Sequence, residues 1–475
     1  MSARKIPVWI LIFMIVTALH GWTQQHDSDS PSQNSQQQQS TSNQQMPDMK
    51  MPKEKQQHEH GNMQGTDHKS MSEMQMNMEE TPKTFVEEIK HHSTSGTSAE
   101  PNSTPMPMLM TMKGKWMLMF HGVAFLNVLQ QSGARGSDKV FSTNWLMPMA
   151  QRRLGPGSFT VRTMLSFEPG TATKHFYPEL FQQGETTFGK PIVDGQHPHD
   201  FVMELAALYD LKLGENGLLS FYFAPMGDPA MGPTAYPHRA STSEDPIAPL
   251  GHHLQDSTHI ADDVITTGLT YKIARFEASG LHGREPDEFR WDIDSGKIDS
   301  WSIRATVNPA QNWSTQYSFA HLTSPEALHP NEDIDRVTAS VMYNRPLSHG
   351  NWASTLLWGR NHTSDGLVWN GYLAESTLRF AERNCVWGRI ENVDRTNELL
   401  LRNIPEPLNF RESIIGRVQA YTAGYDRDFI VPHVAIAPGA QLTVYSTPDT
   451  LKAQYGGHPI GAVVFLRVRP IRKQH

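Results

Sequence analysis

Between about Trp116 and Arg469, hydrophobic and polar positions repeatedly alternate with a period of two. In the run 158–168, one face carries mainly Phe, Val and Leu, whereas the other carries Ser, Thr, Arg and Glu. The runs 300–307, 336–343 and 372–381 show the same separation. Successive side chains of a β-strand point to opposite faces. The pattern therefore predicts strands about 10 residues long, each with one apolar and one polar face.

Short and long connections alternate between these strands. The short ones fall near 154–156, 213–217, 274–275, 308–312, 344–350, 382–384 and 426–432, and the long ones cover 130–138, 169–199, 227–260, 285–297, 323–333, 362–369, 394–410 and 447–459. Outer-membrane barrels have short periplasmic turns and long external loops. We therefore expect residues 115–470 to form an all-β, antiparallel outer-membrane-type β-barrel of about 16 strands, an even number. Trp301, Trp313 and Trp352 are placed near strand ends, as an interfacial aromatic girdle requires.

A soluble β-protein shows the same alternation, so a soluble periplasmic metal-binding protein remains the alternative. In that alternative, the apolar faces would pack into a core instead of facing lipid. The polar faces carry Arg162, Arg304, Arg336 and Arg379. These arginines either tune an aqueous pore or pair with carboxylates such as Glu168 and Glu375. A lumen of about sixteen strands is wide enough for an open channel unless the long loops fold into it.

Two further segments precede the barrel region. Residues 1–22 resemble an export signal, with Arg4 and Lys5 before the apolar run Val8–Leu19, although no clean cleavage motif follows and an uncleaved anchor stays open. Residues 23–114 are rich in Gln, Ser, Met and His and have few aliphatic side chains. Such a composition predicts disorder. Only Phe85–Ile89 suggests a short helical turn or contact site.

Composition narrows the class of protein further. No later apolar stretch approaches the ~18 residues of a membrane-spanning helix, which excludes a polytopic helical membrane protein. The one cysteine, Cys385, leaves no intrachain disulfide. A net charge of −8 gives no reason to expect a nucleic-acid partner. The sequence does not indicate the oligomeric state.

Methionine is concentrated before the barrel. Residues 46–119 hold fourteen of the 23 methionines, many spaced two apart, with histidines among them. Thioether and imidazole ligands select copper, above all Cu(I). The segment is too polar to bury these methionines in a core, so we predict copper binding; a low-complexity linker is the alternative. The predicted ligands are Met49, Met51, His58, His60, His68, Met74, Met76, Met78, Met106, Met108, Met110 and Met112.

Two long loops on the same predicted face of the barrel are rich in histidine. They could converge on a second, divalent metal ion, with an aspartate orienting one imidazole through its second nitrogen. Alternatively, the histidines bind backbone groups and close the loops over the lumen. The candidate ligands are His197, His199, Asp200, His238, His252, His253, Asp256 and His259. The chain has no His-Glu-x-x-His, Gly-x-Ser-x-Gly or Gly-x-x-x-x-Gly-Lys motif, and we expect no enzymatic activity.

The order of export signal, Met/His-rich segment (Met46–Met112) and alternating β-region (Trp116–Arg469) resembles the bacterial outer-membrane copper-resistance proteins of the B type. The resemblance covers the whole chain in layout. It implies a barrel in the outer membrane, in contact with its lipid, with the N-terminal segment in the periplasm. It also implies copper tolerance or handling, as a pore or export component, together with periplasmic copper proteins as partners.

Overall fold

The computed structural model describes residues 81–402 and 404–471. The signal region and the first part of the Met/His-rich segment lie outside the described residues. Within them, sixteen long antiparallel strands form a closed barrel. The barrel strands are β2 (Trp116–Gln131), β3 (Lys139–Leu154), β4 (Gly157–Leu165), β9 (Val202–Leu213), β10 (Gly217–Gly227), β11 (Ala261–Tyr271), β12 (Ala274–His282), β13 (Ser300–Ala310), β14 (Trp313–Leu322), β15 (Ile334–Leu347), β16 (Gly350–Thr363), β17 (Val368–Phe380), β18 (Asn384–Thr396), β19 (Ile414–Arg427), β21 (Val434–Ser446) and β22 (Ile460–Pro470).

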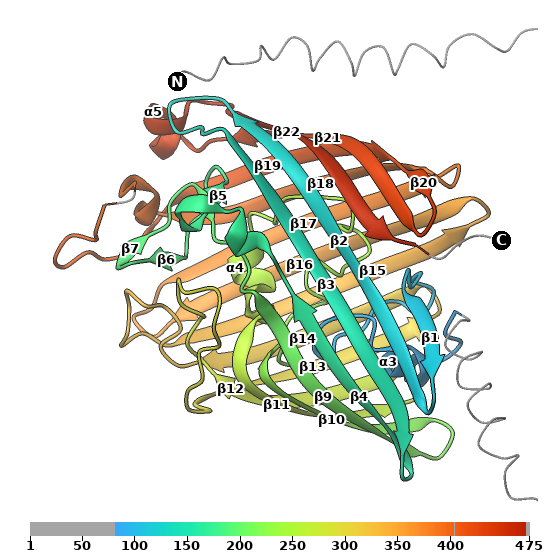
Figure 1. Cartoon of the computed structure of the whole chain (residues 1–475). Helices are drawn as coiled ribbons and strands as arrows, with labels where there is room; N and C mark the ends of the chain where they lie inside the picture. The colour runs from blue at the N-terminus through green and yellow to red at the C-terminus, as the bar shows by residue number, and fades with distance from the viewer. Residues whose placement is uncertain (1–80, 403, 472–475) are drawn as a thin grey trace, which may run out of the picture. The chain divides into compact units, whose positions relative to one another are not determined.

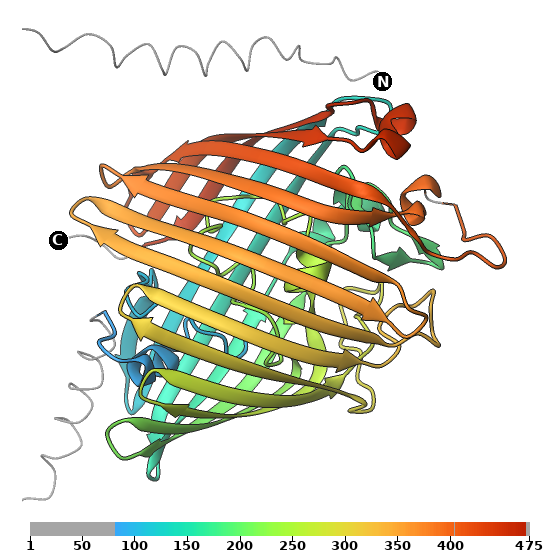
Figure 2. The same ribbon diagram turned by 180° about the vertical axis from the view of Figure 1, so that it is seen from behind.

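Each barrel strand pairs with the next along the chain, and β22 closes the sheet on β2 from Ala124↔Val468 to Gln131↔Gly461. Figure 2 shows this sequential order as a gradual change of colour across one wall. The predicted strand number and antiparallel arrangement are confirmed. Short turns and long loops alternate as predicted, and most link boundaries agree within about three residues.

Shorter elements decorate the barrel. The short strands are β1 (Leu109–Lys113), β5 (Tyr177–Pro178), β6 (Thr186–Thr187), β7 (Lys190–Pro191), β8 (Gly195–Gln196) and β20 (Phe429–Val431). The helices are α3 (Phe85–His91), α4 (His252–Gln255) and α5 (Lys452–Tyr455), and the 3₁₀ turns are η2 (Glu168–Gly170), η3 (Thr173–His175), η4 (Ser257–His259), η5 (Asn397–Leu400) and η6 (Asp449–Leu451). Both views place α3 and β1 at the end of the barrel opposite α5, β6 and β7 (Figures 1 and 2).

The two faces of the wall are divided as the alternation predicts. Val161, Trp301 and Val341 are exposed on the outside, whereas their neighbours Arg162, Ser302 and Ser340 are buried toward the inside. The three tryptophans of the predicted girdle, Trp301, Trp313 and Trp352, lie within three residues of a strand end and are 40–45% exposed.

The expectation of disorder up to residue 114 is wrong for its described part. Thr84 caps α3: its hydroxyl accepts from the Glu87 amide at 3.2 Å, and the Glu87 carboxylate accepts from the Thr84 amide. Phe85 and Ile89 then pack with Leu218 of β10 in a buried cluster. Composition alone could not show this order, because the apolar and polar groups that compensate the ordering entropy belong to the barrel. The suggested contact at Phe85–Ile89 is confirmed.

Candidate functional site

The segment after α3 lies against the inner wall near the short turns. The Asn308 amide donates to the Glu100 carbonyl at 3.0 Å, and the Asn344 amide donates to the Ser103 carbonyl at 2.7 Å. The Ser103 amide in turn donates to the carbonyl of Gln311, which lies in the turn between β13 and β14. These contacts place the segment at the short-turn end of the barrel.

Interior arginines hold this segment. Arg162 pairs with Glu204 at 2.7 Å and donates to the carbonyl oxygens of His92 and Gly96. Arg304 pairs with Glu277 at 3.0 Å and donates to Thr97 Oγ1. The sequence had left open whether these arginines tune a pore or pair with carboxylates. Arg162 and Arg304 pair, but with partners other than Glu168 and Glu375, because strand register and loop placement decide which carboxylate is adjacent. Arg336 instead donates to Asn361 Oδ1 and Ser257 Oγ.

The loop 228–260 also enters the barrel. Arg239, which is fully buried, donates to Glu375 of β17 at 2.6 Å and to Asp256 at 2.8 Å. Further along the loop, Glu244 reaches Arg379, Arg467 and Arg469 near the short-turn ends of β17 and β22. The loop therefore crosses the lumen from the long-loop side to the short-turn side.

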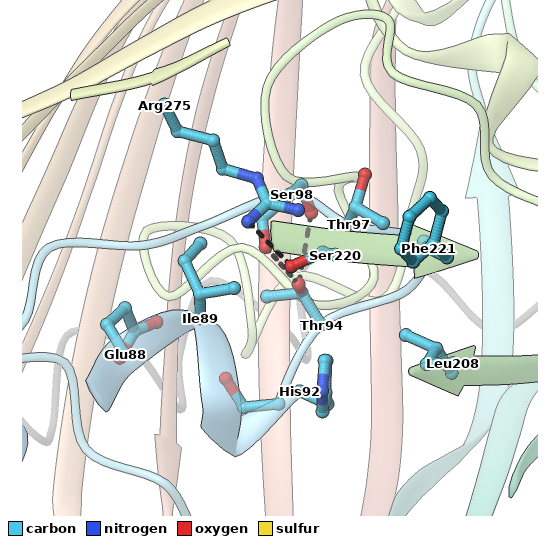
Figure 3. A pocket seen from close by; sticks show the side chains of 12 residues that line it. Glu88, Ile89, His92, Thr94, Thr97, Ser98, Leu208, Ser220, Phe221 and Arg275 are labelled. Carbon is cyan, nitrogen blue, oxygen red and sulfur yellow. Dashed lines mark hydrogen bonds between the residues drawn. The ribbon is translucent and has the colours of Figure 1, made fainter. Parts of the chain in front are cut away.

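Two inserts, the segment 85–104 and the loop 228–260, meet inside the barrel. The Ser95 hydroxyl donates to the Asp228 carboxylate at 2.9 Å. A pocket between α3, the residues after it and the wall strands has a volume of about 10 Å³, room for roughly one water molecule (Figure 3). Burial, reinforced by the nearby Glu100 carboxylate, raises the pKa of Glu88 beside this pocket to about 8. The condition that the loops fold in is met, because the loop 228–260 and the segment 85–104 both contact the interior of the wall.

The two histidine-rich loops converge, as the sequence predicted. Ring centroids of His199 and His259 are 5.3 Å apart, those of His252 and His259 5.2 Å, and those of His197 and His253 6.2 Å. Two elements position this cluster: η4 carries His259, and the one-turn helix α4 carries His252 and His253 against β15, β16 and β17.

Most of these rings already have protein partners. Glu185 lies 2.6 Å from His197 Nε2 and 3.0 Å from His253 Nδ1. Asp256 lies 2.6 Å from His252 Nδ1, while Asp200 pairs with Arg290 at 3.2 Å. His199 lies between Glu168 at 3.0 Å and the Tyr236 hydroxyl at 3.2 Å. Burial lowers the pKa of His197, His253 and His259 well below the ordinary range, so these imidazoles are neutral at pH 7.

No three of these loop residues bring their ligand atoms together. Among the His, Cys, Asp and Glu residues of the described chain, only Asp287, Asp292 and Asp294 place three such atoms within 4.8 Å of one another, and the first two are exposed. Metal binding by the histidine loops stays a prediction, and the observed contacts equally suit loop closure over the lumen.

The methionine ladder of the N-terminal segment meets methionines of the wall. In β1, Met110 lies opposite Met119 of β2, and Met112 lies opposite Met117. Met119 is in turn opposite Met149 of β3. We call the buried thioethers of this region the methionine row; it comprises Met108, Met117, Met119, Met147, Met149, Met164, Met203 and Met226, with Met106, Met110 and Met112 packed against it.

This finding corrects one premise and adds residues that the sequence analysis missed. The premise that the segment is too polar to bury its methionines is wrong for Met106–Met112, because the wall supplies the apolar partners. The missed signal was local: Met117 and Met119, like Met147 and Met149, are spaced two apart on faces that point inward. The other predicted ligands of the segment, Met49, Met51, His58, His60, His68, Met74, Met76 and Met78, lie outside the described residues.

One predicted histidine lies apart from the loop cluster. His238 Nε2 is 3.2 Å from Met164 Sδ, and its ring lies 4.2 Å from that of Trp145. A second histidine, His121 of β2, has its Nε2 at 3.0 Å from Met147 Sδ. The arrangement offers soft sulfur and neutral nitrogen donors, which suit Cu(I) better than Mg²⁺ or Ca²⁺.

Among comparisons with known proteins, only solved structures show a similarity to this chain. No family model matches it, and no curated protein matches it. Solved structures similar to it include an anion-selective porin from Comamonas acidovorans (12% identity, TM-score 0.47, covering 74% of this chain and 99% of that one). Others are OmpF of Salmonella typhi in complex with daunomycin (9%, 0.46, 76% and 100%) and the outer membrane channel DcaP of Acinetobacter baumannii (10%, 0.43, 75% and 99%). None of the helices in the described residues combines the length and apolar character needed to cross a membrane.

Proposed function

We propose that this chain is a porin-like outer-membrane barrel that binds and handles copper, with its Met/His-rich N-terminal segment in the periplasm. The observation that carries the copper proposal is the methionine row. The ladder Met106–Met112 does not end in solvent: Met110 and Met112 lie opposite the wall methionines Met119 and Met117, and Met106 and Met108 belong to the same cluster. A continuous run of thioethers from the segment into the barrel is a path on which a soft metal ion exchanges between like ligands.

The outer wall supports the membrane location. Leu126, Val140, Phe276, Leu356 and Ile390 are each at least 55% exposed on the outside of the barrel. A water-soluble protein rarely exposes so extensive an apolar surface. The interior instead contains fully buried arginines paired with carboxylates. The alternative of a soluble periplasmic protein required an apolar core behind the outward faces, and these faces have none.

The filled lumen bears on whether the barrel transports copper or holds it. In the described conformation, the loop 228–260 and the segment 85–104 occupy the interior. Copper that crosses this barrel requires one of them to move. Copper that is held or presented to another protein requires neither to move, and we propose holding as the basal role, without an enzymatic reaction.

Location and metal preference are tested separately. Cell fractionation should recover the protein with outer membranes, soluble only in detergent; recovery in the periplasmic fraction without detergent would contradict the location.

The purified full chain should bind several Cu(I) ions in competition with a Cu(I) chelator. Replacing Met49, Met51, Met74, Met76 and Met78 by leucine should remove most of the weak Cu(I) binding by the N-terminal segment. Equal affinity for Cu(I) and Zn(II) would refute the copper proposal.

Movement of copper is tested in liposomes. We expect the reconstituted full chain to retain bound Cu(I) and to show slow copper flux, because the inserts fill the lumen. Rapid flux comparable to that of an open porin would contradict holding as the basal role while leaving copper binding intact.

A further inference from the structure

Five side chains meet where the methionine row reaches the loop 228–260. They come from β2, β3, β4 and the loop itself: His121, Trp145, Met147, Met164 and His238. In the sheet, His121 lies directly opposite Met147. The register between β3 and β4, which pairs Leu146 with Leu165 and Met149 with Arg162, carries Met164 next to Met147.

Two nitrogen–sulfur distances within this set are those of ligand atoms that can share one ion. The Nε2 atoms of His121 and His238 lie 3.0 Å and 3.2 Å from the sulfur atoms of Met147 and Met164. Metal–nitrogen and metal–sulfur bonds of about 2.0 and 2.3 Å, as found at zinc sites, place two ligands of one tetrahedral ion about 3–4 Å apart. The two imidazole centroids are 5.7 Å apart, so small side-chain rotations bring both nitrogens to one ion.

Packing alone is a poor explanation for this set. Met147, Met164 and His121 are buried, and leucine would fill the two methionine positions with similar volume. A thioether is a weak hydrogen-bond acceptor, so it compensates little of the cost of burying an imidazole.

We propose that His121, Met147, Met164 and His238 form a site for one Cu(I) ion in the barrel interior, with the indole of Trp145 beside it. This inference rests on the proposed copper function and deepens it, because it names the oxidation state and a defined site beyond the weak thioethers of the N-terminal segment. Trp145 lies 4.2 Å from the His238 ring and 5.0 Å from the His121 ring, centroid to centroid. Its π face can stabilise a bound monovalent cation.

The site has a structural consequence for the loop. Three of its ligands belong to the wall, whereas His238 belongs to the loop 228–260. A bound ion therefore cross-links the loop to β2, β3 and β4, in addition to the ion pairs of Arg239 and Glu244.

The experiment uses the full chain in detergent, in the background in which Met49, Met51, Met74, Met76 and Met78 are leucine. Cu(I), and separately Ag(I) as a soft monovalent probe that does not change oxidation state, are titrated against a competing chelator. Tryptophan fluorescence is recorded in parallel. We expect one tight site per chain, and quenching that is reduced in a Trp145→Phe variant.

Matched variants separate ligation from packing. Met147→Leu and His238→Gln should each weaken the tight site at least tenfold. Met342→Leu changes a buried thioether of β15 that lies outside the methionine row, and it should leave the affinity unchanged. Circular dichroism and heat-modified migration in gels establish that each variant folds. His238 lies in a loop, so its variant tests the site even if Met147→Leu fails to fold.

The outcomes distinguish the two proposals. If Met147→Leu and His238→Gln bind Cu(I) as tightly as Met342→Leu, the interior site is refuted, while binding lost with the segment methionines alone still supports the copper function. If neither the original chain nor this background prefers Cu(I) over Zn(II), the copper function fails, and the interior site fails with it.

Discussion

At the scale of single residues, Gly96 shows how closely the two inserts fit. Its φ of +56° belongs to the left-handed region, and a Cβ at this position would lie 2.4 Å from the Asp228 carbonyl oxygen. Arg162 also donates to the Gly96 carbonyl. The backbone therefore needs glycine here for two reasons, conformation and space.

We predict that Gly96→Ala loosens the segment 85–104 from the lumen without unfolding the barrel. The matched control is Gly114→Ala, because Gly114 has a similar φ of +60° but nothing within 4 Å of the added Cβ. The control should cost about 1 kcal/mol from conformation alone, and Gly96→Ala should cost more. Hydrogen exchange of residues 85–104 measures the difference. Equal protection in the two variants would show that the close contact is not required.

Glu244 gives a pH dependence at the same scale. Burial by itself would raise its pKa, but the guanidinium groups of Arg467, Arg379 and Arg469 outweigh burial and hold the pKa below the ordinary value of 4.5. The folded state therefore prefers the ionised carboxylate. Its stabilising contribution is fully present above about pH 4.5 and is lost as the pH falls through the lower folded-state pKa.

We therefore expect the loop 228–260 to resist proteolysis at pH 7 and to become cleavable as the pH falls below about 4.5. Glu244→Gln should remove most of this dependence. Arg379→Ser should loosen the loop at pH 7 as well, because Arg379 contacts both Glu244 and Asp428. An acid-resistant loop in the original chain would contradict this account of Glu244.

At the scale of elements, the outward faces of the strands determine whether the barrel can lie in a bilayer. Leu356 lies in the middle of β16 and is 62% exposed. Leu378 also lies on the outer face and is half-buried, but it is only two residues before the end of β17. Leu356 therefore reports the bilayer midplane more directly.

We predict that Leu356→Arg destabilises the assembled barrel by about 2–4 kcal/mol or blocks its assembly. The control is Leu347→Arg at the last residue of β15, where a charge near the interface should cost only about 0–1 kcal/mol. Folding into lipid vesicles, followed by urea titration, gives both values. Equal tolerance of the two charges would favour a barrel that is not in a membrane.

At the scale of the whole molecule, a sixteen-stranded wall would enclose a water-filled channel if nothing occupied it. The loop 228–260 and the segment 85–104 occupy it from two sides, and buried ion pairs hold them. The fold is that of a porin-like barrel, and the two inserts occupy its described interior.

We predict that the original chain has low conductance in planar bilayers. Replacing residues 232–256 by a short Gly/Ser linker should raise the conductance severalfold, because the strands β10 and β11 that the loop joins are adjacent in the sheet. Single-channel recording distinguishes the two states. If the original chain conducts like the deletion variant, the inserts do not close the lumen in a membrane.

The sequence by itself determined the barrel. Strand alternation is a local property, since each strand must present one face to the outside and one to the inside, and the strands, links and outward faces followed from it. The convergence of the loops that carry His199 and His259 followed from counting links. The helix at Phe85–His91 was indicated by its apolar residues alone.

Only the tertiary structure decided what fills the barrel. The order of residues 85–113 depends on distant partners such as Arg162 and Leu218, the second of which lies more than a hundred residues further along the chain. Contacts with these partners offset the entropy lost when a polar segment becomes ordered. The methionines of β2, β3 and β4 had the right phase in the sequence, but strand register was needed to place Met147 opposite His121. His238 lies beside Met164 only because its loop enters the lumen. Such an interaction joins distant parts of the chain and leaves no local periodic pattern, so the sequence could not indicate it.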